Sequence, residues 1–459
     1  MKPYNELNYW QYWTRRNFLK AAGAWAGAGL LQPVLPLIGA GKSIAAAYPD
    51  EVLSIEKYTK GRVKPGMVIS KANAELVKDL CPEGLYVELT RGREIKIADT
   101  TMQLDSFVPE YWVQATLRNK GQAVLDKKGQ LWTKDGKPWI GGDPFVEPKS
   151  GLEAMYNHVF NFRRYDDLIE PAYEVDVDRE DGNVVRISEA VFTIIYTVGR
   201  QVADPKPYVP NYMNENYRVS LMIIKPFDVY GLNVGTTIPY AQSELPDTFA
   251  YIPTLRRVRR LPSSQRFEPL RPYAVHYASD INQHNDPLLT WSWKLVGRKP
   301  MLYPAPVNRG LFAKGATKDD FVFPLVERKI QKFPRMTWEL RPEVLIVEGE
   351  PHLEGAPYSR KRMYLDAIIN RSDCADVWDL QGKLWKWMCF PTALVDWPDG
   401  RGGNKVRWEP VLFFSDVQKD YVSNIWIKPE MGGRKLAFNS GLRVDDWLTP
   451  TAMLKLARK

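Results

Sequence analysis

Cysteine and histidine are scarce in this chain of 459 residues, which has three cysteines and four histidines. Three cysteines are too few for a disulfide framework, and the histidines do not form a metal-ligand spacing with them. Cys374 and Cys389 can pair only if their strands are neighbours, which the sequence does not decide. His276 and His284 fall in a polar turn region, which predicts that both lie at the surface. The sequence therefore indicates no metal site.

Sequence motifs of common enzymes are also missing. The chain has no nucleophile elbow, glycine-rich phosphate loop or zinc signature, and no haem, iron–sulfur or nucleotide motif. The neighbouring carboxylates Asp166 and Asp167 are typical of a solvated loop or a helix start. We therefore predict no catalytic residue and no cofactor, and keep an exported enzyme as the alternative.

Concentrated charge and low-complexity sequence are absent as well. The formal net charge is +9, from 63 basic and 54 acidic residues. This charge is mild for the size of the chain and does not indicate a nucleic-acid partner, which needs a concentrated basic face. By contrast, 16 tryptophans and 23 tyrosines are many, and these residues suit broad amphipathic surfaces as well as cores.

The first 47 residues have the pattern of an export signal. Arg15 and Arg16 stand in the segment 14–20, which has the spacing of a twin-arginine signal. A weakly apolar run with two prolines follows, and alanines at 45–47 offer a cleavage site before Tyr48. We expect a cleaved signal and a periplasmic protein that folds before export. A retained membrane anchor is the alternative.

Strand-like alternation dominates the chain after residue 172. Before that point we expect helices at 71–80, from 109 and at 151–162, strands at 85–89 and 95–97, and a hairpin at 124–132. After it we expect strands at 172–177, 184–198, 217–224, 232–240, 289–295, 338–349, 361–366, 375–380 and 383–388. The strand 184–198 is apolar on both faces, so the sheet is covered on both sides there or lines a cavity.

An arginine-rich stretch, 249–262, is predicted to form one long strand that ends at a turn. Arginines fall on both faces of this strand, and each needs water, a carboxylate or a ligand anion, because an unpaired buried charge is costly. Two interpretations stay open. The arginines form structural ion pairs, or Arg256 and Arg259 form the polar rim of an anionic head-group site, since a guanidinium can hold a phosphate or carboxylate with two hydrogen bonds.

Consecutive antiparallel strands with helices mainly near the start indicate an α+β fold built on one large curved antiparallel sheet that a few helices cover. We divide the chain into the signal (1–47), an N-terminal helical and hairpin segment that packs on the sheet (48–160) and the sheet itself (161–459). The concave face of such a sheet must be filled by helices, side chains or a ligand. Its candidate apolar lining consists of Phe192, Ile194, Tyr196, Trp291, Trp293 and Trp338.

Several segments resemble known proteins when they are taken in order. The stretch 249–260 resembles a strand of outer-membrane lipoprotein-sorting-like proteins, and the turn 226–231 matches the one before that strand. Segments 293–299, 360–366 and 379–385 are similar too, and 142–145 with 151–157 resemble a longer periplasmic family of unknown function, family 1329. The resemblance implies a half-open antiparallel barrel over an apolar interior, like that of the carriers LolA and LolB. The twin-arginine signal and the insertion-like stretch 309–332 depart from this pattern.

These observations predict a periplasmic binding protein or carrier for a hydrophobic or amphiphilic, lipid-like molecule. Burial of apolar chain at roughly 25 cal/mol per Å² gives useful affinity without a catalytic group. The resemblance implies an inner-membrane exporter and an outer-membrane protein as partners. The alternative is a non-catalytic structural subunit of an envelope assembly, in which exposed aromatic residues bind protein. The carrier prediction requires an interior with room, or with a movable cover, for an alkyl chain.

Overall fold

The computed structural model describes residues 48–98, 108–161, 165–178, 182–270, 273–305, 337–396 and 405–456. The predicted signal with Arg15 and Arg16 and the insertion-like stretch 309–332 lie outside these ranges. None of the described helices has the length and apolar composition needed to span a bilayer.

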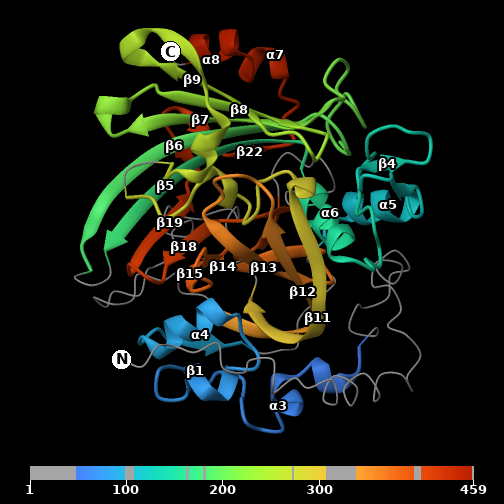
Figure 1. Ribbon diagram of the computed structural model, residues 1–459, viewed down its shortest axis with the longest axis vertical. Helices are drawn as coiled ribbons and strands as arrows, with labels where there is room; N and C mark the ends of the chain where they lie inside the picture. The colour runs from blue at the N-terminus through green and yellow to red at the C-terminus, as the bar shows by residue number, and fades with distance from the viewer. Residues whose placement is uncertain are drawn as a thin grey trace.

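One large curved sheet forms the body of the molecule (Figure 1). Its first half is an antiparallel meander of β5 (Asp167–Asp178), β6 (Val184–Tyr196), β7 (Glu215–Lys225), β8 (Asn233–Pro239), β9 (Asp247–Ile252) and β10 (Arg257–Leu261). Its second half runs through β11 (Trp291–Pro304), β12 (Thr337–Pro351), β13 (Tyr358–Asp366), β14 (Arg371–Asp379), β15 (Leu384–Cys389), β18 (Val411–Asp416) and β19 (Tyr421–Ile427). The last strand, β19, pairs with the first, β5, and so joins the two halves. The predicted α+β fold with an open antiparallel sheet is confirmed.

Short strands extend or accompany this sheet. β2 (Ile95–Ile97) pairs in parallel with the start of β12 and antiparallel with β1 (Val68–Ile69), and β22 (Ala437–Phe438) pairs with β5. Separate hairpins are formed by β3 (Ala123–Leu125) with β4 (Leu131–Thr133), β16 (Ala393–Asp396) with β17 (Lys405–Trp408), and β20 (Glu430–Met431) with β21 (Arg434–Lys435). The predicted strand 95–97 and hairpin 124–132 are therefore confirmed.

Helices cover both faces of the sheet. The α-helices are α3 (Ile55–Tyr58), α4 (Glu83–Thr90), α5 (Glu110–Arg118), α6 (Gly151–Asn161), α7 (Val444–Trp447) and α8 (Pro450–Leu456). The 3-10 turns are η2 (Asp50–Val52), η3 (Ala74–Val77), η5 (Phe227–Val229), η6 (Pro253–Leu255), η7 (Ser263–Phe267), η8 (Ala278–Asp280) and η9 (Leu288–Thr290). Figure 1 shows α6 within the curve of the sheet, and α4, α7 and α8 outside it.

Alternating side chains of the strands divide the core into two clusters. On β13 and β15, Met363, Leu365 and Met388 belong to the cluster on the inner face, whereas Tyr364 and Trp387 belong to the outer cluster. The inner cluster includes α6, and the outer one includes α4 and the β1–β2 pair. A smaller cluster seats the α7 region on β6. These covers explain why the strand predicted at 184–198 is apolar on both faces.

Three local predictions are wrong. The stretch 249–262 is not one strand but the hairpin β9–β10, because Pro253 starts the turn η6 and Arg256 takes a left-handed conformation with φ 51°. The segment 85–89 is not a strand but lies in helix α4, whose first N–H groups are capped by a carboxylate of β14, Asp376. The helix expected at 71–80 shrinks to the single turn η3.

The pair Asp166–Asp167 is also unlike the prediction, because both side chains are buried. Asp166 accepts hydrogen bonds from the backbone N–H groups of Gln201, Val202 and Ala203. Asp167 accepts them from residues 440–442. The two carboxylates therefore hold distant loops at the start of β5, a structural role that satisfies otherwise unpaired backbone donors.

Candidate functional site

The connection between β10 and β11, residues 262–290, lies across the inner face of the sheet (Figure 1). We call it the cover segment; its residues 271 and 272 lie outside the described ranges. β10 and β11 follow each other in the chain, yet they stand at opposite ends of the strand path. The chain must therefore cross from one end of the open sheet to the other, and it does so over the concave face.

The cover segment buries polar side chains under itself. Ser279, Asp280, Gln283, His284 and Asp286 are each at most 3% exposed. Most buried segments are apolar, and each buried polar group needs a partner to offset its lost hydration. The inner face thus meets its cover through polar contacts in addition to apolar ones, such as those of Val275 and Leu288.

Both histidines predicted at the surface lie in this segment and are buried, which corrects that prediction. The ring of His276 stacks on Phe414 of β18, with 4.4 Å between centroids. His284 meets Trp291 and Trp293 of β11 edge to face, at 5.1 and 4.7 Å. Burial, reinforced by the nearby Lys361 ammonium, lowers the pKa of His284 well below its usual value, so this imidazole is neutral.

Asp280 is the centre of the contact between cover and sheet. Its Oδ1 accepts hydrogen bonds from Tyr358 Oη at 2.9 Å and Lys361 Nζ at 3.3 Å. Its Oδ2 accepts from Lys386 Nζ at 2.8 Å and from the backbone N–H of Tyr277 at 3.1 Å. Burial alone raises the pKa of this carboxyl, but Lys386 and Lys361 outweigh burial and lower the pKa to about 2. The carboxylate is therefore ionised and fully hydrogen-bonded.

The two lysines lie side by side on the inner face. Lys361 of β13 and Lys386 of β15 both pair in register with Val377 of β14, the strand between them. Adjacent strands are roughly 4.8 Å apart, so the two Cα atoms are about 10 Å apart and the ammonium groups can meet over Val377. Lys386 also stands 3.3 Å from the ring centroid of Tyr277 in the cover segment. Its pKa is lowered by burial, against the opposing effect of Asp280.

Other contacts fasten the cover segment around this centre. Ser279 Oγ lies 2.7 Å from Tyr358 Oη, and Val275 N–H donates to Ser423 Oγ of β19 at 3.0 Å. His158 of helix α6 lies with Nε2 3.1 Å from the carbonyl oxygen of Asn282. These contacts attach the cover to the second half of the sheet and to α6.

A small cavity remains between α6, β8 and the cover segment, and it is lined by residues that include His158, Tyr217, Gln242, His284 and Asp286. Its volume is about 30 Å³, which is room for about two water molecules. An alkyl chain does not fit in this cavity.

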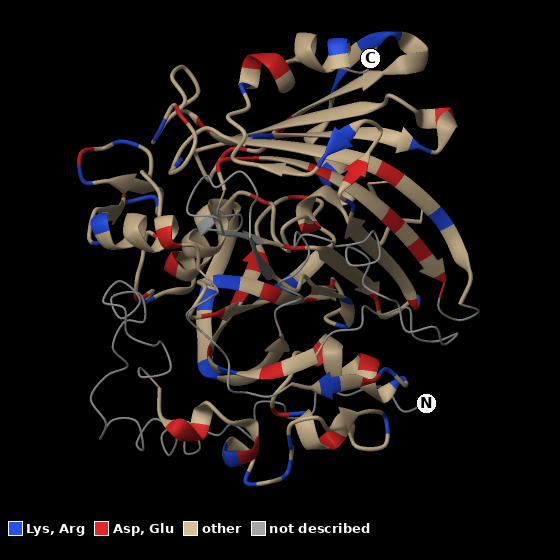
Figure 2. Ribbon diagram, turned by 180° about the vertical axis from the view of Figure 1, so that it is seen from behind, with Lys and Arg blue, Asp and Glu red and all other residues tan. Residues whose placement is uncertain are grey.

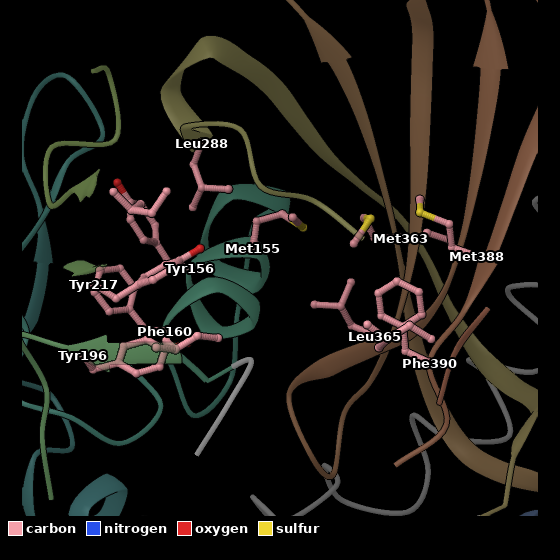
Figure 3. Packing of buried hydrophobic residues seen from close by; sticks show 14 of the residues in the cluster. Met155, Tyr156, Phe160, Tyr196, Tyr217, Leu288, Met363, Leu365, Met388 and Phe390 are labelled. Carbon is pink, nitrogen blue, oxygen red and sulfur yellow. The ribbon is translucent and has the colours of Figure 1, made fainter. Parts of the chain in front are cut away.

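Apolar side chains from α6 and both halves of the sheet surround the polar centre. Figure 3 shows Tyr156 and Phe160 of α6 directed toward Tyr196 and Tyr217, and Met155 directed toward Met363 on the opposite side. Methionine fills irregular gaps and repacks readily, so a surface that contains Met155, Met363 and Met388 adapts to different shapes.

The predicted lining residues fall in two places. Ile194, Tyr196 and Trp291 belong to the inner cluster, and Phe192 and Trp293 pack against it. Trp291 and Trp293 stack with their centroids 5.5 Å apart. Trp338 belongs to the outer cluster, because it shares the side of β12 occupied by its even-numbered neighbours there, Leu340, Val344 and Ile346.

The predicted polar rim lies on the surface. Arg256 and Arg259 are exposed, in the β9–β10 turn and on β10, at one end of the strand path. Within the described ranges neither forms an ion pair, whereas their neighbour Arg260 donates to Asp247 Oδ1 at 2.6 Å. Figure 2 shows basic and acidic residues mixed over many elements of the molecule.

Asp280, Lys361 and Lys386 are not among the site residues predicted from the sequence. The sequence does contain a signal for the two lysines. Lys361 lies on the same face of its strand as Met363 and Leu365, and Lys386 on the same face as Met388, because residues two positions apart share a face. A lysine on the buried face of an apolar strand requires an anionic partner.

Cys374 and Cys389 prove to be register partners on β14 and β15, with free thiols whose Sγ atoms are 3.9 Å apart. No group of His, Cys, Asp or Glu side chains among the described residues is placed to hold a metal ion.

An open antiparallel sheet whose concave face is covered by one crossing segment defines a half-barrel protein. The chain belongs to the family described as protein of unknown function (DUF1329), whose model matches residues 68–452. This confirms the family resemblance in the sequence. A comparison with curated proteins finds no match.

The chain is similar to several solved structures at low sequence identity. A domain described as an outer-membrane lipoprotein-sorting protein, from Vibrio parahaemolyticus, is 13% identical with a TM-score of 0.42. A DUF1329 family protein from Desulfovibrio piger is 14% identical with a TM-score of 0.41, and each alignment covers 63% of this chain and 92% of the other. A LolA superfamily protein from Nitrosomonas europaea is 10% identical over 57% of this chain and 84% of its own length, with a TM-score of 0.33.

Proposed function

We propose that the protein is a non-catalytic periplasmic carrier for a hydrophobic or amphiphilic molecule, which occupies the inner face of the sheet when the cover segment moves away. The observation that carries the proposal is the cover itself. The cover segment together with helix α6, and not a second sheet, closes an apolar concave face, and the central contacts of the cover segment are ionic and polar. An exporter in the inner membrane and an outer-membrane protein are the partners we propose for it.

The polar character of the contact supports a cover that opens. Replacement of a buried ion pair by well-packed apolar residues is often neutral or stabilising, by roughly 1–4 kcal/mol, so a permanent plug gains little from Asp280 and the lysines. Both side-chain polar atoms of Gln283 are buried without a hydrogen-bond partner among the described residues. Each such group costs roughly 1–3 kcal/mol. The closed form therefore has a higher free energy than the most stable packing that this face would allow.

A disulfide lock tests the proposal. Val275 N–H bonds to Ser423 Oγ, so cysteines at these two positions stand close enough to cross-link cover and sheet. We expect the oxidised Val275→Cys/Ser423→Cys variant to lose binding of the neutral fluorophore N-phenyl-1-naphthylamine, and reduction to restore it. Ser423→Cys alone is the matched control and should bind in both redox states. Equal binding by the oxidised and reduced double variant, together with no amphiphile in organic extracts of the purified protein, contradicts a carrier.

One surface feature favours the second function, a subunit of an envelope assembly. Phe227, in the turn between β7 and β8, is 89% exposed and stacks with the exposed Tyr230 at 6.5 Å. Exposed aromatic pairs of this kind are typical of protein-binding surfaces. In that case Phe227→Ala abolishes a complex that survives gentle extraction of the envelope, while the locked variant retains it.

A further inference from the structure

We propose that the ligand carries an oxyanion head group, and that Asp280 occupies the place of this head group on Lys361 and Lys386. The inference rests on the proposed carrier function and adds the chemical class of the ligand. It assigns the anion-binding role to two buried lysines of the sheet.

The first argument is where the two ammonium groups find their partners. Lys361 Nζ donates to Gln283 O at 2.9 Å, to Asp280 Oδ1 at 3.3 Å and to Ser279 O at 3.4 Å. Lys386 Nζ donates to Asp280 Oδ2 at 2.8 Å. Within the described part of the chain, every hydrogen bond from these two groups goes to the cover segment, and none goes to the sheet on which the lysines stand.

Opening of the cover segment therefore removes the hydrogen-bond acceptors of both lysines. When the cover segment moves away, the two ammonium groups lose the carboxylate that both contact, and the sheet itself keeps only Asp416 of β18, the register partner of Lys386, near them. An uncompensated charge in such surroundings is costly, so an incoming anion that restores the contacts is favoured over a neutral molecule of equal size. Tyr358 Oη, which donates to Asp280 at 2.9 Å, stays on β13 as a third donor for the same anion. Asp416 and Asp286 are the other nearby acidic groups around the lysines.

The second argument is the direction of the apolar path that starts at the lysines. β13 and β15 both run antiparallel to β14, so they run in the same direction. Two residues beyond each lysine on the same face stand Met363 and Met388, which share Ala375 of β14 as their register partner. A row of Lys361, Val377 and Lys386 is thus followed by a row of Met363, Ala375 and Met388. Figure 3 shows the side chains of the two methionines.

This sequence of rows matches the two ends of an amphiphile. A head group bridged by the lysines places its tail along Met363, Ala375 and Met388, toward Leu365 and Phe390, all of which belong to the inner cluster. Lysine is a point charge with rotatable donors, which suits a carboxylate or a phosphate alike. The shared chemistry is one oxyanion on an alkyl chain.

The experiment compares dodecanoate, dodecyl phosphate and dodecanol on the full-length mature protein by competition with the neutral fluorophore. For the wild type we expect at least a tenfold tighter Kd for one of the anions than for dodecanol. The variant Asp280→Asn/Lys361→Met/Lys386→Met lacks the carboxylate of the cover and both ammonium groups, and it should lose this preference and still bind dodecanol. Asp280→Asn alone should bind the preferred anion more tightly than the wild type does, because the internal competitor is gone. Lys225→Met, at an exposed lysine of β7, is the control and should keep the wild-type ratio.

The results distinguish failure of the head-group inference from failure of the proposed carrier function. If the anions and the alcohol bind equally well to the wild type, and the triple variant does not change the ratio, the head-group inference is wrong and the carrier function stands. If Arg256→Ala lowers the ratio and the triple variant does not, the anion binds at the surface rim and the inference is again wrong. If none of the three molecules binds to any variant, the carrier function fails as well. A preference for dodecyl phosphate over dodecanoate supports the inference and assigns the head group as phosphate.

Discussion

Removal of the charge of Asp280 should destabilise the closed protein by several kcal/mol. Asp280→Asn leaves Lys361 and Lys386 buried and facing a neutral amide. Breaking a buried pair by neutralising one partner costs about 3–5 kcal/mol, because the other charge stays in surroundings that do not solvate it. A pKa near 2 in place of 3.8 gives an independent lower figure of roughly 2 kcal/mol for the charged form. We therefore expect a loss between roughly 2 and roughly 5 kcal/mol at pH 7.

The dependence on pH has a definite sign. The pKa of Asp280 is lowered in the folded state, so its contribution is complete above pH about 4 and is lost as the pH falls toward about 2. The difference in stability between the wild type and Asp280→Asn should therefore be constant from pH 5 to pH 7 and should shrink at the acid end. If the pKa of Asp280 were the same in the folded and unfolded states, the difference in stability between the wild type and Asp280→Asn would not change with pH.

The assay is urea unfolding followed by far-UV circular dichroism, with midpoints converted to free energies through the slope of the transition. The triple variant Asp280→Asn/Lys361→Met/Lys386→Met is the essential comparison. It removes all three charges, and we expect it to be at least as stable as the wild type, since apolar replacement of a buried ion network is often neutral or stabilising. The reasoning is refuted if Asp280→Asn lies within 0.5 kcal/mol of the wild type, or if the triple variant is less stable than Asp280→Asn.

Three further substitutions test how the inner and outer faces are packed. Gly349→Ala places a methyl group 2.3 Å from the Trp293 ring and should cost about 1–3 kcal/mol, whereas Gly297→Ala on the paired strand meets only Ile346 at 3.9 Å and should stay within about 0.5 kcal/mol in the same urea assay. Gly84→Ala lies in helix α4, where alanine normally stabilises by about 0.5–1 kcal/mol; because its methyl group would stand 2.4 Å from Trp387, we expect destabilisation instead, and a higher midpoint would contradict the close packing.

The sequence predicted the sheet better than the pieces that cover it. The apolar pattern identified most strands of the two halves, but it did not predict β18 and β19, which lead to the junction of the halves. In β6, which is covered on both faces, the pattern is an apolar run on both faces and not a period-two alternation. It failed at 85–89, because a short apolar run fits a strand and a buried helix equally well. There the deciding partner is Asp376, nearly 300 positions away, whose carboxylate caps the helix.

The site was harder to predict because it combines polar residues of a loop with lysines of two strands. Segment 262–290 has the composition of a surface turn, so His276 and His284 were placed in solvent. Their burial follows from topology: the meander ends with β10 at one end of the sheet and resumes with β11 at the other, and only the full strand order reveals that crossing. The pairing of Lys361 and Lys386 over Val377 likewise depends on the register of three strands, which alternation alone does not specify.

The cover segment is tied together internally, and this determines how it should open. Arg266 Nε donates to Asp286 Oδ1 at 2.7 Å, and both residues belong to the cover, on either side of η8. Asn285 N–H donates to Ser279 O at 3.1 Å within the same segment. Contacts inside a segment persist when it moves as a unit, whereas the contacts of Asp280 with the sheet must break.

We therefore expect amide hydrogens of residues 276–286 to exchange together in hydrogen-exchange mass spectrometry, and Asp280→Asn to speed them by a common factor. Arg266→Met removes the internal tie instead, so it should make exchange at 263–270 faster than at 276–284. If Asp280→Asn accelerates only residue 280 and its immediate neighbours, the segment does not open as a unit. In that case a ligand would have to reach the two lysines through local openings beside α6, and the full apolar path along Met363 and Met388 would stay covered.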